Sequence, residues 1–228
     1  MITTMRVPVG TKVVTARAYR ANRPGGVVLV LAHGAGADQS HPFMVRYAEG
    51  LAARGIDAIT FNFLYTEEKR ATPDRTAQLE SCWRSVIEVV RSSFDGALVI
   101  GGKSMGGRIA SHLAAAHLEG PRALVLLGYP LHPPAKPEQL RVAHLHQIEM
   151  PALFVQGTRD AFGGPDDLSP HLAGMRAARV LPIDDGDHSF AVPKRSGKSA
   201  DQVHGYILDE IAAWLRELGL FDIPPKAA

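Results

Sequence analysis

Cysteine is almost absent from this chain, because Cys82 is the single thiol among its 228 residues. One thiol cannot close an internal disulfide, so the chain needs no oxidising compartment in order to fold. The first ten residues contain no long apolar run, and no segment reaches the roughly 18–20 apolar residues that span a membrane. These absences argue against a disulfide-stapled secreted scaffold and lead us to expect a cytoplasmic protein with no membrane partner.

The chain also lacks an excess of charge of either sign. Its 25 basic and 23 acidic residues leave a formal net charge of +2, and lysine and arginine are scattered along the sequence. Nucleic-acid-binding surfaces are usually strongly basic, so we expect no nucleic-acid partner. The 46% hydrophobic fraction, in contrast, is enough for a sizeable core, and the length suits a single α/β domain over residues 1–228.

Short apolar runs alternate along the chain with longer segments of helical periodicity. The runs predict strands buried on both faces of a parallel sheet at 27–32, 56–63, 97–101, 123–128, 152–156 and 178–183, with an outer strand at 11–19. The periodic segments predict helices at 43–54, 72–92, 104–117 and 199–218, the second of them capped by Thr72-Pro73-Asp74. This alternation predicts a mostly parallel, doubly wound sheet flanked by helices, and no irregular stretch is long enough to form a separate cap domain.

The strongest chemical signal is the pentapeptide Gly102-Lys103-Ser104-Met105-Gly106, which matches G-x-S-x-G between a predicted strand and a predicted helix. Side chains at the flanking positions would collide with neighbouring backbone, and glycine removes them. The sharp turn lifts the Ser104 hydroxyl clear of the sheet. It also puts the Met105 N–H at a helix N-terminus, where a developing oxyanion is stabilised. The pattern predicts Ser104 as a nucleophile and Met105 as an oxyanion-hole residue.

A phosphate loop is the competing interpretation of the same segment, since Gly102-Lys103-Ser104 resembles the end of G-x-x-x-x-G-K-S. That motif requires glycine at position 97, where this chain has Ala97. His144 and His146 could indicate a metal site. However, two alternating histidines without nearby acid or cysteine partners are more often surface or hydrogen-bonded residues. We therefore expect neither a metal nor an organic cofactor.

A serine hydroxyl needs a base to take its proton near neutral pH, and the base needs an acid to orient it. The G-x-S-x-G elbow is typical of the α/β-hydrolase fold, in which the chain order is serine, then acid, then histidine. His188 is the one histidine in the loop between the last predicted strand and the last helix, and Asp160 follows the 152–156 strand by a short loop. Asp160 could instead only cap a turn. Three rival acids lie too close to His188 in sequence to occupy a separate strand end: Asp184, Asp185 and Asp187.

The oxyanion hole needs a second backbone N–H, from the loop that follows an early strand. The small residues at 34–37 follow the 27–32 strand and let backbone amides approach a substrate closely. We expect Ala35 to supply this N–H, with Gly34 as the alternative donor and a substrate contact, and His33 to orient the loop. Each such donor typically contributes about 3 kcal/mol to transition-state stabilisation.

Several stretches together resemble a known family, the small capless α/β-hydrolase-like proteins of bacteria: 33–38, 61–65, 101–108, 127–134, 154–160 and 187–190. That family is related to testis-expressed protein thirty and to a regulatory subunit of the NSL histone-acetyltransferase complex. The chain is also similar to dienelactone hydrolases, which usually carry cysteine where this chain has Ser104. The resemblance covers residues 26–218 and implies an α/β-hydrolase fold with the triad Ser104, Asp160 and His188.

The resemblance also draws attention to the Pro- and His-rich loop at 129–149, which is expected to lie over the active-site side. We expect Tyr129, at its start, to contact substrate; a rigid loop without a substrate role is the alternative. The sequence thus predicts a carboxylesterase-type acyl hydrolase acting on a small-molecule ester or other acyl substrate. A binding or scaffold module with the same fold, and an acyltransferase or peptidase, remain as alternatives.

Overall fold

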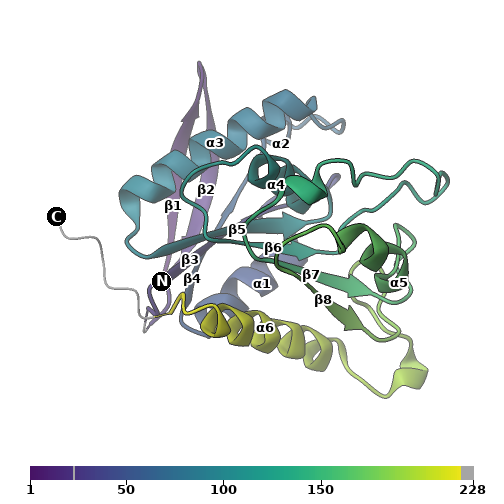
Figure 1. Cartoon of the computed structure of the whole chain (residues 1–228). Helices are drawn as coiled ribbons and strands as arrows, with labels where there is room; N and C mark the ends of the chain where they lie inside the picture. The colour runs from purple at the N-terminus through teal and green to yellow at the C-terminus, as the bar shows by residue number, and fades with distance from the viewer. Residues whose placement is uncertain (23, 222–228) are drawn as a thin grey trace.

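The computed structural model describes residues 1–22 and 24–221, and these form an eight-stranded sheet in the order β1-β2-β4-β3-β5-β6-β7-β8 (Figure 1). Six neighbouring strands are parallel, namely β4 (Ile56–Phe61), β3 (Val27–Ala32), β5 (Ala97–Lys103), β6 (Ala123–Leu127), β7 (Ala152–Gly157) and β8 (Ala178–Ile183). All residues of β3 to β7 are buried, which explains their nearly continuous apolar sequences. The predicted fold class is confirmed.

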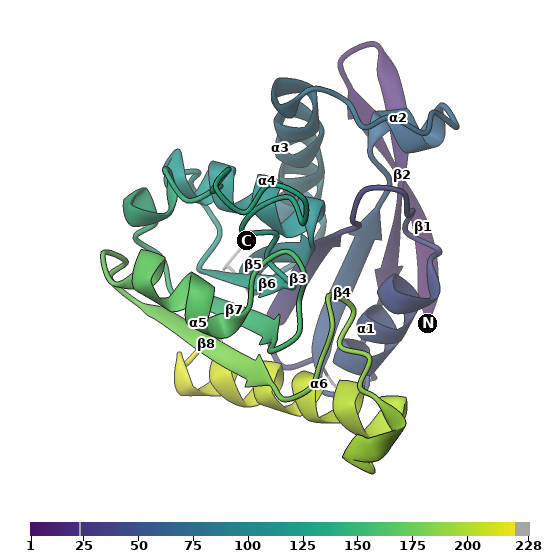
Figure 2. The same cartoon turned by 90° about the vertical axis from the view of Figure 1, so that its right-hand side faces the viewer.

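Helices cover both faces of the sheet. One face packs against α1 (Pro42–Ala52) and α6 (Ala200–Glu217), and the other packs against α3 (Thr76–Ser93) and α4 (Met105–Ala115). Figures 1 and 2 show these two pairs on opposite sides of the sheet. Each long helix buries one apolar stripe, and α3, for example, turns Trp83, Val86 and Val90 toward the core. The sheet is therefore the middle layer of three.

A strand that the sequence analysis did not assign stands at the edge of the sheet. β1 (Ile2–Val9) pairs antiparallel with β2 (Lys12–Tyr19) along its whole length, and β2 pairs antiparallel with β4. Most of β1 is exposed, so its sequence carries little apolar alternation, and Pro8 is tolerated because an edge strand has a free side. Its conformation depends on pairing with β2, which a local pattern cannot reveal.

The predicted start of the helix at 72–92 is wrong by four residues. Asp74 does not cap α3, because its carboxylate accepts the Tyr65 N–H at 3.0 Å and pairs with Arg70 at 2.5 Å. Those contacts join the segment before α3 to the short helix α2 (Leu64–Glu67). The sequence analysis did not predict α2. The helix then begins at Thr76 without a side-chain cap.

The site lies where loops leave the carboxyl ends of the parallel strands, the usual place for ligands in open α/β sheets. The remaining described elements are short turns in these loops: η1 (Leu145–Gln147), α5 (Pro165–Leu168), η2 (Ser169–Leu172) and η3 (Lys194–Ser196). Within the described residues no separate cap domain covers the sheet, and no helix has the length and apolar character needed to cross a membrane. The end of the predicted domain, 222–228, lies outside the described residues.

Candidate active site

Ser104 occupies a tight turn between β5 and α4. Its backbone has φ 50° and ψ −117°, an uncommon conformation for a residue with a side chain, and its N–H donates to the Leu127 carbonyl at 3.0 Å. The flanking glycines permit this turn. A Cβ at Gly102 or at Gly106 would lie 2.4 Å from the carbonyl oxygen of Ala32 on the neighbouring strand. The predicted collision is therefore real, and only glycine fits at either position.

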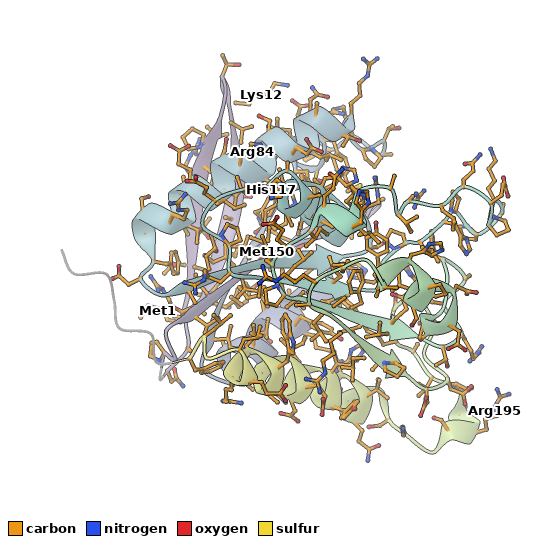
Figure 3. All side chains as sticks on the ribbon, viewed as in Figure 1. Met1, Lys12, Arg84, His117, Met150 and Arg195 are labelled. Carbon is orange, nitrogen blue, oxygen red and sulfur yellow. The ribbon has the colours of Figure 1, made fainter. Side chains whose placement is uncertain are left out.

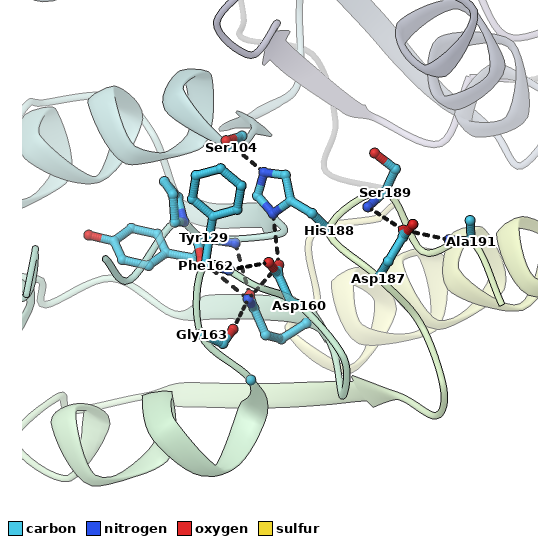
Figure 4. Close-up of polar contacts among 12 residues, drawn as sticks. Ser104, Tyr129, Asp160, Phe162, Gly163, Asp187, His188, Ser189 and Ala191 are labelled. Atoms are coloured by element: carbon cyan, nitrogen blue, oxygen red, sulfur yellow. Dashed lines mark hydrogen bonds and ion pairs between the residues drawn. The ribbon is translucent and has the colours of Figure 1, made fainter. Parts of the chain in front are cut away.

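The structure brings Ser104, His188 and Asp160 into one hydrogen-bonded chain, drawn in Figure 4. The Ser104 hydroxyl lies 2.9 Å from His188 Nε2, and His188 Nδ1 lies 2.8 Å from Asp160 Oδ2. A carboxylate only accepts hydrogen bonds, so Nδ1 carries the ring proton and Nε2 is free to accept the serine proton. These three residues come from the loops after β5, β8 and β7.

Asp160 is buried and fully hydrogen-bonded. Besides His188, its carboxylate accepts the Phe162 N–H at 2.8 Å and the Gln156 side-chain amide at 2.9 Å. Gln156 also accepts the Tyr129 N–H at 2.8 Å and donates to the Gly163 carbonyl at 2.6 Å, so one amide ties the acid to two loops. Such donors stabilise a buried negative charge. The sequence analysis gave Gln156 no role, although a polar residue inside the buried run Ala152–Gly157 signals a structural partner.

The His188 loop is also held by contacts other than the hydrogen bonds of its ring to Ser104 and Asp160. The Phe162 ring packs on the imidazole with centroids 4.2 Å apart. Asp187 accepts the backbone N–H groups of Ser189 and Ala191 at 2.8 and 2.9 Å, and it therefore shapes the turn around His188 (Figure 4). Of the rival acids, Asp187 is occupied by this turn, whereas Asp160 contacts the ring.

A cavity of about 520 Å³ opens over this chain of residues. It is lined by Ser104, His188, Gly34, Ala35 and Met105, among others.

The position of Tyr129 differs from the prediction that it contacts substrate. Its side chain is buried, it does not line the cavity, and its hydroxyl donates to the Arg141 carbonyl at 2.6 Å. Tyr129 therefore holds the 129–149 loop in place, and the cavity-lining residues of that loop are Pro130 and Arg141.

Ala35 and Met105 line the same cavity as Ser104, from the 33–37 loop and from the elbow. Among the described residues, the Ala35 and Met105 N–H groups have no protein acceptor. His33 fixes the loop that carries Ala35: its Nε2 accepts the Phe63 N–H at 3.3 Å, and its Nδ1 donates to the Gly34 carbonyl at 2.8 Å. Burial lowers the pKa of His33, which keeps the ring neutral in this role.

Lys103, next to the serine, is the most unusual charge in the site. Its side chain is buried, and within the described part of the chain its ammonium has no hydrogen-bond partner. Burial lowers the pKa of Lys103 to about 8, although the charges of Asp160 and Asp187 act in the opposite direction. The amine thus lies beside Ser104 without a hydrogen bond to Ser104, His188 or Asp160.

The fold and the geometry of the site together define an α/β hydrolase. Residues 25–216 match the family model described as an alpha/beta hydrolase domain, so the chain belongs to that family. The solved structures of similar fold include a dienelactone hydrolase, which belongs to the second group of proteins that the sequence resembles.

The chain is similar to a dienelactone hydrolase from Anabaena variabilis, with 20% identity, a TM-score of 0.72, and coverage of 95% of this chain and 97% of that chain. It is also similar to a serine hydrolase without lid from Xanthomonas campestris (18% identity, TM-score 0.73, 98% and 97% covered). A third similar structure is Est1E from Butyrivibrio proteoclasticus (13% identity, TM-score 0.75, 94% and 98% covered). At these identities the likeness concerns the fold.

Proposed function

We propose that this protein is a carboxylesterase-type serine hydrolase with Ser104 as nucleophile, His188 as general base and acid, and Asp160 as the orienting carboxylate. The observation that carries the proposal is the hydrogen-bonded chain from Ser104 through His188 to Asp160, which ends at the wall of an open cavity. A serine near neutral pH becomes nucleophilic when an imidazole with the correct tautomer takes its proton.

In the first half of the reaction, the Ser104 oxygen attacks the ester carbonyl carbon while its proton moves to His188 Nε2. Asp160 then stabilises the imidazolium through Nδ1–H. The resulting oxyanion is stabilised by the Ala35 and Met105 amides. Collapse of the intermediate breaks the bond to the alcohol oxygen, which takes the proton from Nε2. Water then attacks the acyl-enzyme by the same route, releasing the acid and regenerating Ser104.

The direction of the Ala35 amide supports its part in this scheme. The described chain contains no cis peptide, so the Ala35 N–H points opposite to the Gly34 carbonyl. That carbonyl is held by the buried His33 ring and also accepts the Ala37 N–H at 3.3 Å. The Ala35 N–H is accordingly left on the other side of the peptide, and Ala35 lines the cavity.

Similar proteins are consistent with a small acyl substrate, since one of the solved structures of Est1E holds ferulic acid. The decisive assay is a panel of 4-nitrophenyl esters of increasing acyl length, given to the wild type and to Ser104→Ala. We expect turnover that falls by about 10⁴-fold or more in the variant, with a burst of nitrophenol in the wild type. Equal rates in both proteins would remove Ser104 from the reaction.

The same assay separates the alternatives. Added alcohols or amines that divert the acyl group into new esters or amides would indicate an acyltransferase, and cleavage of amide substrates would indicate a peptidase. The resemblance to the NSL-complex subunit motivates the scaffold alternative. A complete lack of turnover together with stable complexes in pull-downs would favour it. The cytoplasmic location stays a prediction, which cell fractionation can test.

A further inference from the structure

Two arginines on the cavity wall, Arg108 and Arg141, take no part in the proposed acyl transfer. Both line the same cavity as Ser104. Among the ion pairs of residues 1–22 and 24–221, neither guanidinium pairs with a carboxylate. Arginine is the usual residue for bidentate recognition of carboxylate and phosphate groups, so two unpaired guanidinium groups in one cavity require an explanation.

Arg108 is placed by the elbow itself. It lies one helical turn beyond the nucleophile, and its N–H donates to the Ser104 carbonyl at 2.9 Å. Four residues of helix rise by about 6 Å, and residues four apart lie on one helix face. Its Nη1 lies 3.4 Å from Nε2 of His112, whose Nδ1 faces Glu80 at 3.1 Å. Within the described residues, the guanidinium of Arg108 thus contacts only an imidazole ring, and its other N–H groups are available to a ligand.

Arg141 reaches the cavity from the 129–149 loop, and its backbone is fastened on both sides. Its N–H donates to the Leu131 carbonyl at 2.8 Å, and its carbonyl accepts the Tyr129 hydroxyl at 2.6 Å. The guanidinium itself makes only a long contact of 3.4 Å with the Pro130 carbonyl. The backbone is therefore held in place for a side chain that has no strong partner of its own within the described structure.

The two guanidinium groups act on each other. Burial lowers the pKa of Arg108, and the positive charge of Arg141 lowers it further. Neighbouring like charges raise the free energy of the empty site, and an anion between them would relieve the repulsion. The cavity is also lined by the lysine next to the serine and by one acid, Asp74, whose charge is already paired with Arg70. A nearly neutral chain thus has a positively charged active-site cavity.

From this arrangement we infer that the substrate carries an anionic oxyacid group, a carboxylate or a phosphate, about one helical turn from its scissile ester carbonyl. Arg108 and Arg141 bind that group from α4 and from the 129–149 loop, while the ester lies at Ser104. The inference rests on the proposed function and names the substrate class for it. Arg108 and Arg141 are specificity-determining residues in this account.

A matched pair of esters tests the inference. Mono-4-nitrophenyl adipate carries a free carboxylate at the far end of its acyl chain, and its methyl ester is neutral and otherwise the same. We expect the wild type to release nitrophenol from the anionic ester with at least a tenfold higher kcat/KM. Arg108→Met and Arg141→Met should each lower kcat/KM for the anionic ester by about 10–100-fold, the usual loss for a hydrogen-bonded charge. The loss with the neutral ester should be smaller, so the ratio of kcat/KM for the anionic ester to kcat/KM for the neutral ester should fall by at least about tenfold.

Arg84→Met is the matched control. Arg84, which is labelled in Figure 3, is exposed on α3 and does not line this cavity, and its loss removes the same charge from the molecule. It should leave the preference for the anionic ester intact. Circular dichroism confirms that each variant is folded. If Arg84→Met lowers the preference as much as Arg141→Met, the effect comes from net charge and the inference is overturned.

The outcomes also separate this inference from the proposed function. Ser104-dependent hydrolysis with no preference between the two esters overturns the inference and leaves the esterase standing. If no ester is hydrolysed, the proposed function fails, and adipate titrated into Ser104→Ala still tests the inference by calorimetry. Binding that disappears in the Arg141→Met background supports it, and no binding of adipate or inorganic phosphate overturns it. A parallel phosphate titration identifies which oxyacid the arginines prefer.

Discussion

Within the described residues, two serine–histidine hydrogen bonds of nearly equal length lie near α4, one at its start and one within it. Ser104 lies 2.9 Å from Nε2 of His188, and Ser111 lies 2.7 Å from Nε2 of His144. Each histidine stands near a further polar group: His188 contacts Asp160, while the His144 ring packs against His112, whose own partner is Glu80. Distance alone does not distinguish the two pairs.

The direction of the protons does distinguish them. Ser111 donates its one hydroxyl proton to the Arg108 carbonyl at 2.7 Å, so His144 Nε2 must donate to the serine. The Ser104 proton, in contrast, points to an imidazole that is already held by a carboxylate on its other nitrogen. Burial and the neighbouring His112 lower the pKa of His144 to about 4, so this ring is neutral.

Access distinguishes the pairs as well. Ser104 lines the cavity on a strained turn, whereas Ser111 is fully buried within α4. A buried hydroxyl that satisfies a helix carbonyl contributes to folding, because it leaves no polar group unpaired. The short contact to an imidazole is common to both serines, and the accepting Nε2, the open cavity and the nearby amides are the reasons why we propose Ser104 and not Ser111 as the nucleophile.

The largest expected effect comes from replacing the two histidines. His188→Ala should lower kcat for a 4-nitrophenyl ester by about 10⁴–10⁶-fold, because it removes the base. His144→Ala should leave kcat within about threefold, and its cost should appear as a lower melting temperature. Equal losses of activity in the two folded variants would abolish the distinction between the pairs.

Substitution of the two acids, Asp160 and Glu80, should give the next largest difference in kcat. Asp160→Asn should lower kcat by about 10⁴-fold, since an amide in place of the carboxylate allows the wrong tautomer of His188. Glu80→Gln should change kcat for a neutral 4-nitrophenyl ester by less than about threefold, because Glu80 contacts His112 and does not line the cavity. Both rates are read from initial velocities at saturating ester. A strong activity defect in Glu80→Gln would connect the two networks.

The buried amine of Lys103 should make the free energy of unfolding depend on pH. Between pH 8 and 10.5, Lys103 is neutral in the native protein and protonated when unfolded, so the free energy of unfolding rises with pH. Lys103→Met should abolish that rise, which amounts to about 3 kcal/mol over this interval. Urea titrations at several pH values measure it, with the exposed Lys198→Met as control. A wild-type curve parallel to that of Lys103→Met would contradict the assignment.

The smallest effect concerns Tyr129, which lies beside Ser111 of the Ser111–His144 pair. Tyr129→Phe removes the hydrogen bond to the Arg141 carbonyl and should lower the free energy of unfolding by about 1 kcal/mol. Hydrolysis of a neutral ester should change by less than about twofold, because the hydroxyl does not line the cavity. A tenfold higher KM for that ester would restore Tyr129 as a substrate contact.

Local signals predicted most of the fold. The buried strands and the elbow have short sequence patterns, and the glycines at 102 and 106 are explained by the approach of Ala32. β1 was missed because its pairing with β2 stabilises it, and the start of α3 was wrong because Asp74 bonds to Tyr65. Those contacts join segments that a local pattern treats separately.

The site was predictable only in part for a similar reason. The sequence pointed to the residues that the structure brings together at Ser104, because chain order in this fold limits the choices for acid and base. It could not show that Tyr129 turns away from the cavity, that Arg141 lines the cavity, or that Gln156 donates to Asp160. Side-chain direction in an irregular loop depends on tertiary packing.

Labelling with a fluorophosphonate tests the central claim most directly, because the reagent reacts covalently with an activated serine. Peptide mass spectrometry of the folded protein should find one adduct, on Ser104, and none on Ser111, and His188→Ala should prevent the labelling. An unlabelled Ser104 in folded protein, or an adduct on Ser111, would contradict the account.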